Sequence, residues 1–196
     1  MYSGKLFTLN RSKFEFSNRV LMLIRNTIYF LKWTMHSFSL VLIRFCLSAW
    51  VGAAVIFVIT GVQDVTFKPF DSLVRDQLIS LHFPVYYTIA WVLLVGSFLG
   101  CLGIRKRIGI SRRRSNLILC LVVIVLSISL IDYFWIYSPL EAMITPPGSP
   151  RPAEFHSYHQ ASKYINSLII LLSLIAAVLV NLPEKCRTTS RNQPDA

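Results

Sequence analysis

Long apolar runs dominate the pattern of this 196-residue chain. A helix that crosses a bilayer needs about 20 mostly apolar residues. Four stretches are long enough, at about residues 38–60, 83–103, 117–137 and 164–182. Strands would be shorter and would alternate polar with apolar positions. The pattern therefore predicts an all-α polytopic membrane protein built as a four-transmembrane-helix bundle.

The segment before these runs, residues 1–37, has a different pattern. Its apolar positions 20–33 are interrupted by Arg25, and Asn18, Arg25 and Lys32 are seven residues apart. Residues at that spacing share one stripe of a helix. The spacing predicts an N-terminal amphipathic helix that lies in the membrane interface, with its basic side chains toward anionic headgroups. A fifth span centred on Arg25 is the alternative. A signal peptide is disfavoured, since no small-x-small cleavage site is nearby.

The charges outside the runs predict an orientation. Fifteen of the 20 Lys and Arg residues lie in residues 1–37, in the link between the second and third runs, and in the tail of residues 183–196. The other two loops hold five acids, namely Asp64, Asp71, Asp76, Glu141 and Glu154. Because basic loops stay cytoplasmic, both termini and the middle link are expected in the cytoplasm. Short loops and the absence of targeting signals favour a bacterial inner membrane.

Composition narrows the class of protein further. Hydrophobic residues make up 54% of the chain and charged residues 15%, which excludes intrinsic disorder and argues against a large soluble enzyme. The net charge of +11 raises the question of nucleic acid. Topology and anionic lipid explain this charge better, since each basic residue near an anionic surface contributes about 1 kcal/mol. The expected partner is the lipid bilayer, with no nucleic acid.

The motifs of enzymes and of bound cofactors are missing from the sequence. It contains no Gly-rich phosphate loop, no HExxH and no Ser-His-Asp order, so no enzymatic activity and no cofactor are expected. There is no CxxC pair either. The cysteines are expected to be buried, reduced thiols in the spans or in the tail, at Cys46, Cys101, Cys120 and Cys186.

The start of the fourth run carries an F-x-x-Y-H-x-x-S-x-x-x-N string, formed by Phe155, Tyr158, His159, Ser162 and Asn166. This string resembles the signature at the last helix of the transmembrane protein 205-like family, whose four-span members are largely of unknown function. A second motif, with Phe83, Pro84 and Tyr86, is similar to the family's F-P-x-Y-F. Asp132 departs from the family, whose members tend to carry Asn there. The resemblance implies a four-helix membrane bundle and supplies no activity.

A polar stripe enters the membrane with the fourth run. His159, Ser162 and Asn166 are three and four residues apart, so they share one helix face. Unpaired polar groups are costly in hydrocarbon, so this face is expected to point into the bundle. One interpretation is that the stripe bonds to neighbouring helices and fixes their packing. The other is that, with Asp132, it lines a cavity for a small solute or an ion.

Asp132 is the only acid within the runs, and it too has two interpretations. An intramembrane acid is a functional hypothesis by default. The alternative is a solvated side chain at the interface, beside the aromatic residues that follow it.

Two further features leave the function open. His82, His156 and His159 are expected at a depth similar to that of Asp132, which makes them weak candidates for a metal- or haem-binding redox bundle. Gly96 and Gly100 form a GxxxG that permits close helix approach, either within the chain or in a homo-oligomer. The hypotheses are therefore solute or ion handling, support of a membrane complex, a redox bundle, and a pure scaffold.

Overall fold

The computed structural model describes residues 3–104 and 111–183, and all of its regular elements in these ranges are helices. They are α1 (Ser3–Thr66), α2 (Ser72–Ile104), α3 (Arg112–Asp132), the π-helix η1 (Tyr133–Tyr137), α4 (Ser138–Met143) and α5 (Phe155–Asn181). Four segments are long and apolar enough to cross a membrane: Ser37–Asp64, Ser72–Ile104, Arg112–Met143 and Phe155–Asn181. The prediction of an all-α four-span bundle is confirmed.

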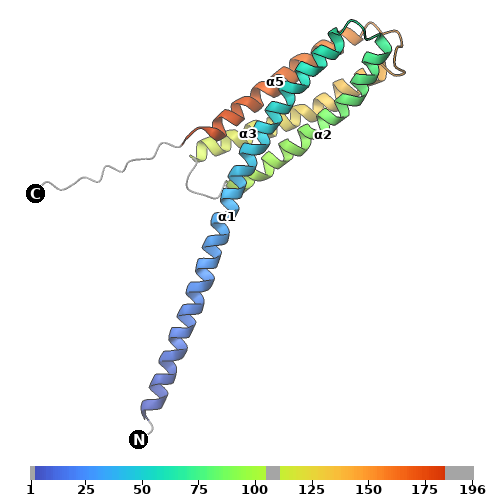
Figure 1. Cartoon of the computed structure of the whole chain (residues 1–196). Helices are drawn as coiled ribbons and strands as arrows, with labels where there is room; N and C mark the ends of the chain where they lie inside the picture. The colour runs from blue at the N-terminus through green and yellow to red at the C-terminus, as the bar shows by residue number, and fades with distance from the viewer. Residues whose placement is uncertain (1–2, 105–110, 184–196) are drawn as a thin grey trace, which may run out of the picture.

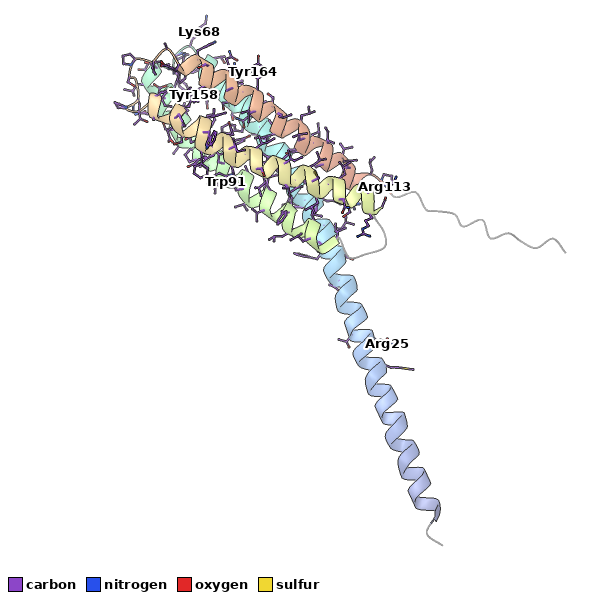
Figure 2. The ribbon with its side chains drawn as sticks, turned by 180° about the vertical axis from the view of Figure 1, so that it is seen from behind. Arg25, Lys68, Trp91, Arg113, Tyr158 and Tyr164 are labelled. Carbon is purple, nitrogen blue, oxygen red and sulfur yellow. The ribbon has the colours of Figure 1, made fainter. Side chains whose placement is uncertain are left out.

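The helices form one antiparallel bundle, with a long part of α1 outside it (Figure 1). Helix α1 packs on α2 and α5, and α3 packs on the same two helices from the opposite side. We call the end where α3 begins and α5 ends the basic end, because it carries Arg112, Arg113 and Arg114. The opposite end, with the acids of the two other loops, is the acidic end. Figure 2 labels Arg113 at the basic end, and Lys68 and Tyr158 at the acidic end.

The N-terminal segment differs from its prediction in one respect. It is helical, but it is not a separate helix, because α1 continues without interruption over 64 residues. At 1.5 Å per residue this is a rod of about 96 Å, and its first half leaves the bundle along the axis of the first span (Figure 1). Neither glycine nor proline occurs between Gly4 and Gly52, so no residue in this stretch favours a break.

The helices are also longer than the apolar runs that predicted them. The second span begins at Ser72 rather than near Phe83, and the fourth at Phe155 rather than near Tyr164. The additional turns lie at the acidic end and are mostly polar. An α-helix satisfies its own backbone hydrogen bonds, so it continues past the apolar region until its sequence stops it.

The third span contains a π-helical turn. Helices α3, η1 and α4 follow one another without a gap from Arg112 to Met143, and η1 begins directly after Asp132. Pro139 stands near the start of α4 and has no N–H to donate to the carbonyl of Trp135. The π-turn therefore lies just where the regular hydrogen-bond ladder is broken. Such turns are frequent at functional sites.

The core has two parts of different character. An aliphatic half at the basic end contains the buried residues Ile43, Leu47, Cys101, Ile104, Ile118, Val122, Ala176, Ala177 and Val180. An aromatic half toward the acidic end contains Trp50, Ala54, Tyr86, Tyr87, Ala90, Leu94, Val125, Tyr137 and Ile169. Outward-facing side chains such as Phe45, Val92 and Trp135 are 65–76% exposed, as expected for a surface in contact with lipid.

Gly96 and Gly100 serve the packing of α1 on α2. A Cβ atom added at Gly100 would lie 2.5 Å from Cγ1 of Ile43 and 3.1 Å from the backbone oxygen of Ser39. One added at Gly96 would lie 3.0 Å from Sγ of Cys46. Of the two uses considered for the GxxxG, the structure shows the one within the chain, because α1 lies against both glycines.

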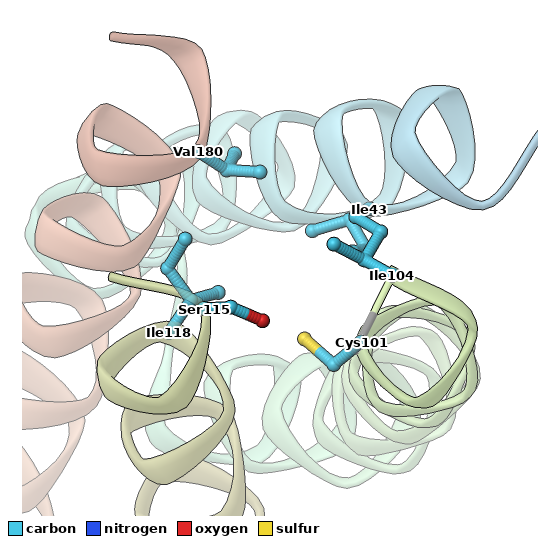
Figure 3. A pocket seen from close by; sticks show the side chains of 6 residues that line it. All are labelled: Ile43, Cys101, Ile104, Ser115, Ile118 and Val180. Carbon is cyan, nitrogen blue, oxygen red and sulfur yellow. The ribbon is translucent and has the colours of Figure 1, made fainter. Parts of the chain in front are cut away.

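A small pocket lies at the basic end, between α1, α2, α3 and α5 (Figure 3). Its volume of about 10 Å³ holds one water molecule at most. It is lined by Ile43, Cys101, Ile104, Ser115, Ile118 and Val180.

Three of the four cysteines belong to the part of the chain that the structure describes. Cys46, Cys101 and Cys120 are free thiols, in agreement with the prediction. Cys46 and Cys101 are buried, whereas Cys120 is exposed on the apolar surface of α3, so burial was wrongly expected there. Cys186 lies outside the described residues.

Candidate functional site

Asp132 is the centre of a buried polar cluster. Its side chain is 0% exposed. One carboxylate oxygen, Oδ2, accepts a hydrogen bond of 2.6 Å from the hydroxyl of Tyr87 and one of 3.3 Å from Nδ2 of Asn166. The other oxygen, Oδ1, is buried and has no hydrogen-bond partner among the residues that the structure describes. The solvated interfacial position that was the second interpretation of Asp132 is therefore wrong.

Asn166 connects this carboxylate to two further side chains. Its Oδ1 accepts a hydrogen bond of 3.1 Å from the hydroxyl of Tyr86. Its Nδ2 also lies 3.0 Å from the backbone oxygen and 3.2 Å from Oγ of Ser162, one turn earlier on α5. The polar cluster thus joins α2, α3 and α5, and its members are Tyr86, Tyr87, Asp132, Ser162 and Asn166.

Aromatic rings surround the polar cluster. The ring of Phe57 stacks on Tyr86 at a centroid distance of 4.2 Å, and Tyr137 lies 5.1 Å from Tyr87 and 5.4 Å from Phe83. Trp50 lies 5.3 Å from Tyr86 and donates a hydrogen bond of 3.0 Å to Oγ of Ser173. Rings in such contact leave little room for bulk water. Electrostatic interactions at the carboxylate are therefore stronger than they would be in water.

The polar cluster is closer to the acidic end than to the basic end. At 1.5 Å per residue, Asp132 is about 30 Å from the start of α3 and about 17 Å from the end of α4 at Met143. Between Asp132 and the basic end the bundle is filled by Leu94, Val125 and the aliphatic half. In this conformation, the shorter route from solvent to Asp132 is thus from the acidic end.

The structure brings together three of the four residues of the predicted cavity. Asp132, Ser162 and Asn166 are in contact, as the polar stripe predicted. His159 is not in the polar cluster: it is exposed, and its ring stacks on Phe155 at 5.8 Å with an angle of 9°. It occupies the first turns of α5, where a polar ring reaches solvent.

The histidines proposed as weak metal ligands do not converge. His82 pairs with Asp64 at 3.5 Å, while His156 and His159 are exposed on α5. Within residues 3–104 and 111–183, no group of three or more His, Cys, Asp or Glu side chains is placed to hold a metal ion. The described residues therefore offer no set of three or more such ligands for a metal ion.

The residues of the two family-like motifs have different positions. Tyr86, Ser162 and Asn166 belong to the polar cluster, and Phe83 packs against it. Tyr158 is half-buried, and Phe155 packs under Arg151, whose guanidinium carbon is 4.5 Å from the ring centre. Pro84 lies inside α2, where Oγ1 of Thr88 donates to its carbonyl oxygen.

Sequence reasoning missed two features. The sequence pattern predicted no role for the hydroxyls of Tyr86, noted only as part of a motif, and of Tyr87, yet these hydroxyls are donors in the polar cluster. The second is a buried ion pair at the acidic end, where Asp76 is only 1% exposed. Its Oδ1 accepts 2.8 Å from Nη2 of Arg151, and its Oδ2 accepts 3.1 Å from the N–H of Gly148. Both are long-range contacts, for which the sequence contains no local signal.

Comparison with known proteins finds no relative of this chain. No family model, no curated protein and no solved structure matches the chain. The resemblance to the transmembrane protein 205-like family therefore stays a prediction, and the chain is an integral membrane protein with four apolar helices.

Proposed function

We propose that this membrane protein handles a proton or a small monovalent cation, which it takes up at Asp132 from the acidic end. The observation that carries the proposal is Oδ1 of Asp132, which has no hydrogen-bond partner among the described residues and belongs to a side chain that is 0% exposed. A buried charge is costly unless it is paired. The negative charge of this carboxylate must therefore be neutralised by a bound proton or cation. Intramembrane acids are rare and mark ion or proton pathways.

The neighbours of Asp132 suit this role. Tyr87 and Asn166 both donate to Oδ2, so one oxygen is held in place while the other stays available. A pure scaffold would be better served by a carboxamide or by full pairing of both oxygens. The π-turn that begins at Tyr133 lies directly beside the carboxylate, and such turns are frequent at functional sites.

The aliphatic half limits what mechanism is possible. It separates Asp132 from the basic end, so a continuous pore is not compatible with this conformation. Passage of an ion across the membrane requires a second conformation, in which the helices separate on the basic side of Asp132. The proposal assigns no enzymatic activity and no bound cofactor to the chain.

The first prediction tests the carboxylate in sealed liposomes that contain the purified full-length protein and a trapped pH dye. A potassium diffusion potential drives protons, and a parallel series with radioactive sodium tests a metal cation. Wild type is expected to carry one of the two. Asp132→Asn is nearly isosteric and is expected to lower that flux at least about tenfold, because it removes the only carboxylate within the apolar runs.

The matched control for this flux measurement is Ser97→Ala. Ser97 is a buried polar residue of α2, and its hydroxyl bonds to the carbonyl of Leu93 in its own helix. The Ser97→Ala variant should have the same ion flux as wild type. Circular dichroism should show equal helix content for all variants. Equal flux in wild type and Asp132→Asn, or no flux above empty liposomes, would contradict the proposal in favour of a scaffold.

The orientation is part of the same proposal. We infer that the basic end faces the cytoplasm of a bacterium, where anionic headgroups attract it. The positive-inside rule supports this, because the N-terminal part of α1, the start of α3 and the end of α5 are all on that side of the bundle (Figure 1). A reporter that fluoresces only in the cytoplasm should be bright at either terminus. A periplasmic phosphatase fused at the same positions should be inactive, and the opposite result would reverse the orientation.

Family membership is likewise proposed. Support comes from the positions of Tyr86, Ser162 and Asn166, which the two motifs place in separate helices and which meet in the polar cluster. Asp132 stands where the family tends to carry Asn. On this proposal, the ionisable group is a property of this chain rather than of the whole family.

A further inference from the structure

Two arginines from different spans lie at the last turn of α5. Arg44, on α1, donates from Nε to the carbonyl oxygen of Val180 at 3.3 Å. Arg114, on α3, donates from Nε to the carbonyl oxygen of Leu179 at 2.6 Å and from Nη2 to that of Leu182 at 2.5 Å. Leu179 and Val180 are consecutive, with Cα atoms about 3.8 Å apart. Both guanidinium groups are thus held at one end of one helix.

This place has an excess of positive charge. The end of a helix carries about −0.5 of an elementary charge, which two guanidinium groups more than balance. In the described part of the chain, neither Arg44 nor Arg114 forms an ion pair with a carboxylate. Each guanidinium has five N–H donors, and only one of Arg44 and two of Arg114 are used by these bonds. The two residues of α3 that precede Arg114, Arg112 and Arg113, are exposed and add to the positive potential.

Apolar side chains adjoin the two arginines on the surface of the bundle. The exposed ones nearest in sequence are Val41 and Phe45 on α1, Leu117 on α3, and Val178 and Leu182 on α5. Helix α5 ends at Asn181, so this region is the boundary between the apolar belt and the basic end. A ligand that fits it has an anionic head and an apolar tail.

We propose that Arg44 and Arg114 form a binding site for the phosphate of an anionic phospholipid, with phosphatidylglycerol as the simplest example. Arginine suits this ligand because its planar donors match the phosphate oxygens in pairs. A zwitterionic headgroup would bring an ammonium group toward a site that is already positive. The acyl chains lie along the outside of α1 and α5, since the neighbouring pocket holds one water molecule at most.

The site differs from a general attraction of basic residues to an anionic surface. Its two guanidinium groups are held by bonds to the backbone at the end of a third helix. Arg112 and Arg113, which are exposed as Arg44 is, make no such bond among the residues that the structure describes. The proposal therefore predicts that the loss of Arg44 and Arg114 weakens lipid binding more than the loss of Arg112 and Arg113, although both changes remove the same charge. It is also independent of the cation site, because Asp132 is about 27 Å from Arg114 along α3.

The test uses native mass spectrometry of the full-length protein released from nanodiscs that contain equal amounts of phosphatidylglycerol and phosphatidylcholine. Wild type should retain one phosphatidylglycerol in preference to phosphatidylcholine. The double variant Arg44→Gln/Arg114→Gln should bind it about 30-fold more weakly, because each of the two charges that contact the phosphate contributes about 1 kcal/mol. The control Arg112→Gln/Arg113→Gln has the same net charge but changes no group that contacts the phosphate, so its retention of the lipid should stay close to that of wild type.

Further arms separate the other outcomes. Arg44→Lys/Arg114→Lys keeps the charge but loses the paired donors, so its affinity for phosphatidylglycerol should lie between those of wild type and the glutamine variant. If the glutamine variant does not fold, this lysine variant takes its place in the test. Asp132→Asn should bind lipid like wild type, whatever its flux. Equal losses in both glutamine pairs, equal retention of the two lipids, or displacement by millimolar inorganic phosphate would each overturn the proposal.

Discussion

Replacing Gly100 by leucine is expected to disrupt the packing of α1 on α2 and to unfold the bundle at markedly lower temperature. The first side-chain atom alone would lie 2.5 Å from Cγ1 of Ile43 and 3.1 Å from the backbone oxygen of Ser39. The side chain of Ile43 is 1% exposed, and the pocket beside it has a volume of only about 10 Å³. A backbone oxygen cannot move without moving α1. Overpacking typically costs about 1–3 kcal/mol and occasionally more, and the contact with backbone places Gly100→Leu at the upper end of this range.

The measurement is the loss of helical signal and of Trp fluorescence on heating in detergent, followed for wild type and variant together. Gly52→Leu is the matched control, because nothing lies within 4 Å of a Cβ atom at Gly52. This control should be as stable as wild type or slightly more so, since leucine is a better helix former than glycine by up to about 1 kcal/mol. Equal behaviour of the two variants would show that α1 and α2 are not packed through Gly100.

The same experiment separates the two uses of the GxxxG. If Gly100 served a homo-oligomer instead of α1, Gly100→Leu would lower the mass of the particle in solution and leave the monomer folded. The structure predicts the reverse order, in which the fold is lost and no intact smaller particle is formed.

The ion pair between Asp76 and Arg151 is expected to have the second large effect on stability. Arg151→Gln removes the only side-chain partner that the structure shows for a carboxylate that is 1% exposed. A buried charge without its partner destabilises a protein by about 3–5 kcal/mol. The lower end of that range applies here, because the side chain of Arg151 is 42% exposed and the N–H of Gly148 still donates to Asp76.

The double variant Asp76→Asn/Arg151→Gln should recover much of this loss, since it removes the buried charge together with its partner. Lys68→Gln is the control for a change of charge at the acidic end, because Lys68 is exposed. Unfolding in detergent should therefore rank Lys68→Gln as most stable, then the double variant, then Arg151→Gln. A double variant no more stable than Arg151→Gln would show that Asp76 carries no uncompensated charge.

This ion pair also has a geometrical consequence for the candidate site. The loop from Ile144 to Glu154 joins α4 to α5, and thus connects the spans that carry Asp132 and Asn166. The bond from Arg151 to Asp76 ties that loop to α2, the helix of Tyr86 and Tyr87. A variant that loses the ion pair should therefore also disturb the polar cluster, although the two are separate in sequence.

The sequence alone was sufficient for the number of spans and for the side of α5 that faces inward. Ser162 and Asn166 interrupt an otherwise apolar helix, and a polar group in hydrocarbon must find a partner within the protein. The same reasoning made Asp132 a candidate. It failed for His159, because that residue lies in the first turns of α5, where polar groups can meet solvent instead of a partner.

The tertiary structure decided which of these residues meet. Tyr87 and Asp132 are 45 residues apart, and Tyr86 and Asn166 are 80 apart, so no local pattern joins them. Three further features also depend on how the helices are rotated against each other. These are the burial of Asp76, the close packing of α1 on Gly100, and the bond from Arg44 of α1 to the backbone of α5. The physical reason is that apolar periodicity determines which segments leave water, whereas helix rotation and register depend on packing between side chains that are distant in the chain.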